Sequence, residues 1–370
     1  MSTSTTKSHS NSIYLLTVKV FTRFENKRNY FERPRLVGIY NIDHIKFNPA
    51  HRIKNHFKEP EPSSYPLDLN ASEDLFGFLK YETQTNLFHP LLHAVFSGTS
   101  MLALEEERAP TTPDDIERTN VYTRRGILER IMEFCYTKYS FTVCVSRCNG
   151  KLFMVQQAPK KNVYNDNQPV HHMRLSQLVF GDPTGKTSNG KGSMIYDDNV
   201  FQVLVHKTSL GKFDIYYVGR TQGIIPDKAE QKINDLETLN GQRFVAVKQM
   251  LSELRNDDLK LLKYWLQGYL SNIKEIYIAY KDSDGIVREP LEYQKLSDIP
   301  KKCSWKPNVC TSFLLEFLNR VENLMSDVDS LDTVYRFTFN AKYKTVYYQI
   351  HEGKSDYSFI PHEYGEFVQE

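Results

Sequence analysis

The fold is decided by two short stretches, YYVGRTQ at residues 216–222 and RFVAVK at residues 243–248. Aromatic and β-branched residues fill the first stretch, and apolar and polar residues alternate in the second. Both are therefore predicted to be strands with one face in a core. A polar segment rich in Lys, Asp, Glu and Asn joins them. We expect the two strands to be neighbours, with Gly219 and Lys248 close to their ends.

The ends of these strands have the outline of a metal-dependent nuclease site without its acids. Such a site needs carboxylates on the first strand and another acid two residues before the lysine on the second. The reason is that Mg²⁺ takes hard oxygen ligands, while the lysine holds a phosphate or the attacking water. Those places are taken here by Arg220, Gln222 and Ala246. The sequence therefore predicts no metal, no cofactor and no catalysis at this site.

Composition restricts the class of protein further. The chain has 370 residues, of which 40% are hydrophobic and 13% aromatic, which is enough for a substantial core. The net charge is +2 with both signs interspersed, which argues against bulk electrostatic or sequence-specific DNA binding. Five cysteines without a signal-peptide pattern indicate a reducing compartment. No apolar run approaches the ~18 residues of a membrane span, so we expect a soluble intracellular protein.

The pattern along the chain predicts one domain. Residues 1–12, rich in Ser and Thr, are expected to be a disordered tail, and residues 13–370 a single α+β domain without repeat or linker. The expected helices lie at residues 72–82, from 127 to about 135, 257–270 and 310–325. The expected strands lie at residues 13–24, 31–40, 201–207, 213–221 and 273–280, with hairpins at 141–156 and 334–350.

Three patterns invite interpretation as ligand sites. Gly181–Thr187 resembles a phosphate loop, but only three residues, one of them a proline, separate its glycines where that motif needs four, which favours a mobile surface loop. The pair His171-His172 is not expected to bind metal, because adjacent side chains point apart and no acid or Cys follows at ligand spacing. Core positions rather than metal ligands are expected for the cysteines without paired spacing, Cys135, Cys144 and Cys148.

Five segments resemble, in order and in spelling, the DXO family of decapping exonucleases. They are FERP at 31–34, YTRRG at 122–126, LLKYWLQ at 261–267, WKPNVC at 305–310 and YSFIP at 357–361. The resemblance covers nearly the whole chain after the tail. It implies a DXO-like domain with two mixed or antiparallel β-sheets flanked by helices. In that family, a carboxylate cluster binds Mg²⁺ and hydrolyses RNA 5′ ends.

The resemblance also implies which residues occupy the site. The family's Gly-Glu-x-Asp corresponds to residues 219–222 and its Glu-x-Lys to residues 246–248, and the remaining Glu falls near Gly185. The degenerate catalytic positions are thus Gly185, Arg220, Gln222 and Ala246. The family uses an Arg before a Gly and a Gln on a later helix near the RNA. The residues expected to bind RNA are therefore Arg125, Lys248, Gln267 and Arg220.

We expect a catalytically inactive, DXO-like protein that binds or shields RNA 5′ ends. Among members of that family, the pattern without acids most resembles one associated with piRNA-source transcripts in the fly germline. This implies a nuclear, chromatin-associated gene-silencing complex with partners of the Rhino and Deadlock type, which protects piRNA precursors from processing and transcription termination. Two alternatives stay open. One is a protein scaffold without RNA binding, and the other is an active nuclease with ligands moved to Asp214, Glu230 or Glu253.

Overall fold

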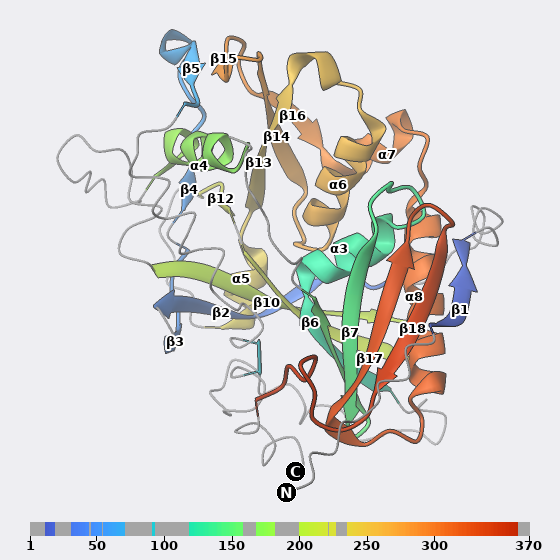
Figure 1. Cartoon of the computed structure of the whole chain (residues 1–370). Coiled ribbons are helices and arrows are strands. Elements are labelled where there is room, and N and C mark those ends of the chain that lie inside the picture. Colours follow the sequence, from blue (N-terminus) through green and yellow to red (C-terminus); the bar gives the residue numbers. More distant parts are fainter. Residues whose placement is uncertain are drawn as a thin grey trace, which may run out of the picture.

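A computed structural model describes most of the chain, and Figure 1 shows its arrangement. The described residues are 12–18, 31–43, 46–53, 55–70, 91–92, 118–157, 168–181, 200–220, 222–226 and 235–361. The predicted tail, except for residue 12, and the predicted helix at 72–82 lie outside them. So do Gly185, Glu230 and all but the first residue of the glycine-rich loop at 181–187.

The larger sheet of the described structure has ten strands and mixed direction. β11 runs parallel to β6, which runs parallel to β8, and the other pairs are antiparallel. In spatial order the strands are β1 (Ile13–Thr17), β18 (Thr345–His351), β17 (Ser330–Asn340), β7 (Phe141–Cys148), β8 (Lys151–Gln156), β6 (Thr119–Arg124), β11 (Phe213–Arg220), β10 (Val200–Leu210), β2 (Arg35–Asp43) and β3 (Lys46–Pro49).

The second sheet of the described structure has eight strands, and β13 lies near its middle, parallel to β14. In spatial order it contains β5 (Leu67–Asp68), β15 (Ile286–Val287), β14 (Glu275–Lys281), β13 (Phe244–Leu251), β12 (Gly223–Ile224), β4 (His56–Phe57) and β9 (Phe180–Gly181), and β16 (Glu292–Lys295) also pairs with β14.

The helices cover the faces of these sheets. They are α3 (Arg125–Glu133), α4 (Gln168–Val179), α5 (Leu236–Gly241), α6 (Asp258–Tyr269), α7 (Ile299–Lys302) and α8 (Pro307–Leu324), with 3₁₀ turns η2 (Pro62–Ser64), η4 (Ser252–Leu254) and η5 (Leu296–Asp298). Figure 1 shows α4 on one side of the smaller sheet and α6 on the other. None of the helices in these ranges is long and apolar enough to cross a membrane.

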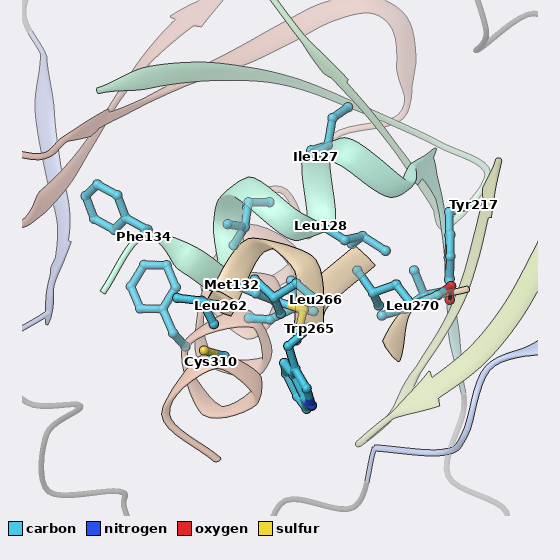
Figure 2. Packing of buried hydrophobic residues seen from close by; sticks show 14 of the residues in the cluster. Ile127, Leu128, Met132, Phe134, Tyr217, Leu262, Trp265, Leu266, Leu270 and Cys310 are labelled. Atoms are coloured by element: carbon cyan, nitrogen blue, oxygen red, sulfur yellow. Dashed lines mark hydrogen bonds between the residues drawn. The ribbon is translucent and has the colours of Figure 1, made fainter. Parts of the chain in front are cut away.

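The main core lies where α3, α6 and α8 meet between the two sheets. Figure 2 shows Leu128 and Met132 of α3 beside Leu262 and Leu266 of α6, with Cys310 of α8 close by. Alternation along the strands sends the opposite residues elsewhere. In β11, Tyr216 and Val218 pack in a second cluster on the far face of the larger sheet, and in β13, Val245 and Val247 pack in a third cluster against α4. This alternation decides which side chains reach the candidate site.

The predicted fold class is confirmed: the domain is α+β, with two mixed sheets flanked by helices. The hairpin at 141–156 is also confirmed, and Asn149 and Gly150 at its turn have the positive φ angles of 51° and 70° that its sequence predicts. The helix predicted at 310–325 begins earlier, at Pro307, since a proline suits the first helical position.

One expectation about the deciding stretches is wrong. The two stretches do not form neighbouring strands of one sheet: β11 belongs to the larger sheet and β13 to the smaller one. β11 ends at Arg220, and within a few residues β12 pairs with β13, through Gly223 opposite Val245. The chain therefore passes from one sheet to the other at the place where the sequence predicted a continuous strand.

Candidate functional site

Arg125 is held at the point where the two sheets approach each other. β6 ends at Arg124, opposite Val218 of the parallel strand β11, so the first residue of α3 lies beside the end of β11. Nη1 of Arg125 donates to the backbone oxygen of Arg220 at 2.8 Å and to Oγ of Ser271 at 2.7 Å. A Cβ at position 219 would lie 3.1 Å from that Nη1 atom, so Gly219 lets the guanidinium lie against the strand.

Three further side chains connect Arg125 to Lys248. Glu129 follows one helical turn after Arg125, and its Oε1 accepts from Nε of Arg125 at 2.9 Å. Its Oε2 accepts from Nε2 of Gln267 on α6 at 3.2 Å. Oε1 of Gln267 accepts from Nζ of Lys248 on β13 at 2.7 Å. We call these four residues, Arg125, Glu129, Gln267 and Lys248, the polar chain.

The polar chain is largely shielded from water. The side chains of Arg125 and Glu129 are 20% and 9% exposed, and Gln267 and Lys248 are partly buried. Burial, followed by repulsion from Arg125, lowers the pKa of Lys248 to about 7, although Glu129 acts in the opposite direction. Among the described residues, Lys248 makes one hydrogen bond, to Gln267, and its Nζ lies 5.8 Å from the centre of the Tyr264 ring. An ammonium has three N–H donors, so this group can bind an anion without losing its present partner.

Arg220 contributes its backbone to this site, and its side chain belongs to the other face of the strand. Residues two apart on a strand share a face. Arg220 therefore lies on the same face as Val218, and it pairs with Val203 of β10, which packs in the same second cluster. Burial lowers the pKa of Arg220 to about 10. The structure thus brings together three of the four residues expected to bind RNA, Arg125, Lys248 and Gln267, but not Arg220.

Gln222 is bound to β13 through its side chain. Its Oε1 accepts from the backbone N–H of Val247 at 2.9 Å, and its Nε2 donates to the backbone oxygen of Val247 at 3.0 Å. The same Nε2 lies 3.1 Å from Nε2 of His172. Burial, followed by repulsion from Lys248, lowers the pKa of His172 to about 4, so its ring is neutral near pH 7 and can accept this bond. The amide of Gln222 therefore takes the place of a strand residue beside β13.

The described residues do not fit a divalent metal ion here. Ala246 offers no ligand and is 2% exposed in the main core. The one amide oxygen of Gln222 already accepts from Val247. Within the described part of the chain, no group of three or more His, Cys, Asp or Glu residues could hold a metal ion. Gly185, the fourth position implied by the resemblance, lies outside the described residues.

Of the acids considered as relocated ligands, the two described ones, Asp214 and Glu253, belong to no group that could hold a metal ion. Asp214 lies near the start of β11, where Arg118 approaches it at 2.7 Å and Oγ of Ser209 donates to it at 2.6 Å. Although burial alone raises the pKa of Asp214, these hydrogen bonds hold it below its ordinary value. Glu253 is exposed in η4, and Glu230 lies outside the described residues.

Sequence reasoning missed Glu129 and Ser271, and it considered His172 only as a possible metal ligand. The helix begins at Arg125, two residues before the predicted start, and with that start Glu129 could have been found, because residues four apart on a helix lie on the same face. Ser271 and His172 carry no comparable signal, since their contacts join elements distant in sequence. The interpretation of the cysteines is confirmed for Cys144 and Cys148, which are buried, and Cys135 is partly buried against the main core.

Comparison with known proteins gives consistent findings. Residues 32–365 match the family described as RAI1 like PD-(D/E)XK nuclease. The chain is 35% identical to the Drosophila melanogaster protein named cutoff over 101 residues, which are 27% of this chain and 26% of that protein. It is 23% identical over 341 residues to the decapping nuclease RAI1 of Aspergillus fumigatus, covering 82% of this chain and 86% of that protein. The match to cutoff thus spans about a quarter of that relative's length.

A solved structure has the same fold. The crystal structure of Candida albicans Rai1 in complex with pU5-Mn2+ covers 97% of this chain and 99% of its own, with a TM-score of 0.67. Sequence identity over this superposition is 15%, and the likeness therefore establishes the arrangement of the elements alone.

Proposed function

Because this chain belongs to the RAI1-like PD-(D/E)XK nuclease family, we propose that it is a member without catalysis that binds or shields the 5′ end of RNA. The observation that supports the proposal is the contrast between two sets of positions. Those expected to carry acids hold Arg220, Gln222 and Ala246, and Gln222 is bonded to the backbone of β13. Three of the four positions expected to meet the RNA hold Arg125, Lys248 and Gln267, which are joined in the polar chain.

The polar chain suits the phosphate at an RNA 5′ end. Arg and Lys form charge-assisted hydrogen bonds with phosphate oxygens, and an arginine presents its donors in a fixed planar fork. Arg125 is 20% exposed and Lys248 partly buried, so both groups keep some contact with solvent. The Candida albicans relative was crystallised with pU5, which is consistent with a phosphorylated RNA as ligand.

The cellular role belongs to the same proposal. The resemblance described above implies a nuclear, chromatin-associated complex with proteins of the Rhino and Deadlock type, and the 35% identity to cutoff over 101 residues is consistent with that resemblance. In it, this chain would occupy the 5′ ends of piRNA precursors and protect them from processing and termination. The proposed domain extent is residues 13–370, preceded by a disordered tail at 1–12.

Titration of labelled RNA by fluorescence anisotropy tests the binding. Single-stranded RNA with a 5′ monophosphate is expected to bind the wild-type protein more tightly than the same RNA with a 5′ hydroxyl. Arg125→Ala and Lys248→Ala should each weaken binding of the phosphorylated RNA by roughly 10- to 100-fold, since a charge-assisted hydrogen bond contributes about 1 to 3 kcal/mol. Affinity should also fall as salt rises.

Lys301→Ala is the matched control for general electrostatic attraction. Lys301 is an exposed lysine on α7, paired with Asp298, and its removal should leave the preference for the 5′ phosphate unchanged. Equal binding of both RNAs, or binding that is unaffected in the Arg125→Ala, Lys248→Ala double variant, would move RNA recognition away from this site. A wild-type protein that binds neither RNA would favour the scaffold alternative.

Catalysis is tested separately with capped and 5′-monophosphorylated RNA in Mg²⁺ or Mn²⁺. No release of nucleotides or caps is expected, because the ligand set that holds such an ion is replaced. Metal-dependent release that disappears on chelation and in the Lys248→Ala variant would show an active nuclease at this site. Release that persists in that variant would point to relocated ligands.

A further inference from the structure

The anion nearest to the two cations of the candidate site is part of the protein itself. Resting on the function proposed above, we propose that Glu129 is an internal competitor of the RNA 5′ phosphate. It engages Arg125 directly and Lys248 through Gln267, and so it limits how tightly the site holds that phosphate. The proposal identifies a regulatory contact inside the site and a residue that sets its affinity.

Glu129 occupies hydrogen-bond donors that a phosphate would also use. Each of its two carboxylate oxygens accepts one hydrogen bond, from Nε of Arg125 at 2.9 Å and from Nε2 of Gln267 at 3.2 Å. A phosphate offers the same kind of acceptor and would seek the same donors. While Glu129 is in place, the Nε donor of Arg125 is already occupied.

Glu129 also places a negative charge beside the two cations of the site. Arg125, Glu129 and Lys248 interact electrostatically, and Glu129 favours the charged form of Lys248, an effect that a bound phosphate would itself exert. The side chain of Glu129 is 9% exposed, so water screens this interaction less than it would at the surface. An incoming phosphate would meet a fixed negative charge beside the two cations that attract it. Removal of that charge should therefore strengthen phosphate binding.

The geometry of Gln267 makes Glu129→Gln a specific test. Gln267 turns its oxygen to Lys248 and its N–H to Glu129. A glutamine at 129 keeps the bond from Gln267 only if its oxygen faces Gln267. Its own NH₂ group then faces Nε of Arg125, where two donors cannot bond. The variant thus removes the charge and releases that donor, while Ser271 and the backbone of Arg220 still hold the guanidinium.

The experiment measures anisotropy with 5′-monophosphorylated and 5′-hydroxyl RNA of one sequence, at one salt concentration. Glu129→Gln is expected to bind the phosphorylated RNA about tenfold more tightly than the wild type and the hydroxyl RNA equally well. The matched control is Glu133→Gln, which removes the same charge one turn further along α3. In the described structure the side chains of Arg125 and Gln267 bond to other partners. Glu133→Gln should change the affinity less than about twofold.

The outcomes separate this inference from the proposed function. Wild-type binding that depends on Arg125 and Lys248, without a gain in Glu129→Gln, would overturn the role of Glu129 and leave the function standing. If Glu129→Gln binds the phosphorylated RNA and the wild type does not, Glu129 competes as proposed. The proposed function of the wild-type protein would then be wrong. Absence of binding in both would overturn both.

A second variant covers the case in which Glu129→Gln does not fold, as judged by circular dichroism. Glu129→Asp keeps the charge but shortens the side chain by one methylene, so it cannot hold both Arg125 and Gln267 at their present distances. Glu129→Asp is predicted to bind the phosphorylated RNA more tightly than the wild type, by a smaller factor than Glu129→Gln. An affinity no higher than that of the wild type would contradict the proposal.

Discussion

At the scale of single residues, Lys248 is the group through which pH should act on the site. Its pKa of about 7 in the folded protein is lowered first by burial and then by Arg125, whereas an unfolded lysine titrates near ~10.4. Between these values the unfolded chain binds more protons than the folded one. Stability from this residue is therefore lowest at and below pH 7 and rises as the pH increases toward 10.

Chemical denaturation at pH 7 and pH 9 checks this expectation. The unfolding free energy of the wild type should rise relative to Lys248→Met, by less than about 1.4 kcal/mol per pH unit, because the lysine keeps some contact with water. RNA affinity should move the opposite way, since a phosphate prefers the charged amine. Identical pH profiles for the two proteins would mean that Lys248 titrates as an exposed lysine does.

At the scale of elements, Gln222 extends the pairing of β12 with β13. Gly223 and Ile224 pair with Val245 and Phe244 through the backbone, and the Gln222 amide continues this pairing to Val247 through its side chain. A side-chain amide has the same donor and acceptor as a peptide group, which explains how it replaces one. The contact holds the chain where it passes between the sheets.

Gln222→Ala should therefore lower stability. It leaves both backbone groups of Val247 and the ring of His172 without their present partner, at a cost of about 2 to 4 kcal/mol. Gln242→Ala is the matched control. Within the described structure Gln242 makes one side-chain hydrogen bond, to the backbone of Thr238 at 3.0 Å, and its loss should cost less than about 1 kcal/mol. Equal effects of the two substitutions in urea denaturation would refute the role of Gln222.

Element by element, prediction from sequence succeeded where the signal was local. The Asn149-Gly150 turn and the helical spacing of α6 depend on neighbouring residues, and both are confirmed. The assignment of β11 and β13 to different sheets depends on contacts between distant segments, which no local pattern carries. The face of Arg220 follows from strand alternation with Val218, but expecting all motif residues in one place obscured it.

The candidate site was predictable in the same partial way. Arg125, Lys248 and Gln267 were named through the family resemblance, and the structure brings them together. The acceptor that joins them, Glu129, was not. Site motifs identify residues that contact a ligand. The partners of these residues in the absence of a ligand depend on tertiary packing, here the packing of α3 against α6.

At the scale of the whole molecule, we expect partner binding to be separable from the polar chain. The four side chains of the polar chain are buried or partly buried, whereas interfaces between proteins use accessible side chains. A folded Arg125→Ala, Lys248→Ala double variant should lose its preference for 5′-phosphorylated RNA but co-precipitate nuclear partners as the wild type does. If RNA and partners are lost together, both bind one surface.

Restoring the family's acids is a poorer probe of this separation. Ala246→Glu would place a carboxylate in the main core, where position 246 is 2% exposed, and Gln222→Asp would shorten the side chain that holds Val247. An unpaired carboxylate inside a protein is strongly disfavoured. The acid-restored protein is therefore expected to unfold more readily, and a loss of partners from it would not identify the interface.

The polar chain also links the two sheets mechanically. It begins at Arg125, which is bonded to the backbone at the end of β11 in one sheet, and it ends on β13 in the other. Its three hydrogen bonds, of 2.9, 3.2 and 2.7 Å, act in series. A load that draws the sheets apart would act on all three at once, and a series of links yields at its weakest member. The longest bond, between Glu129 and Gln267, is the one between uncharged amide and carboxylate. Under such a load the polar chain would break there, leaving an intact ion pair on one side and a lysine with its amide on the other.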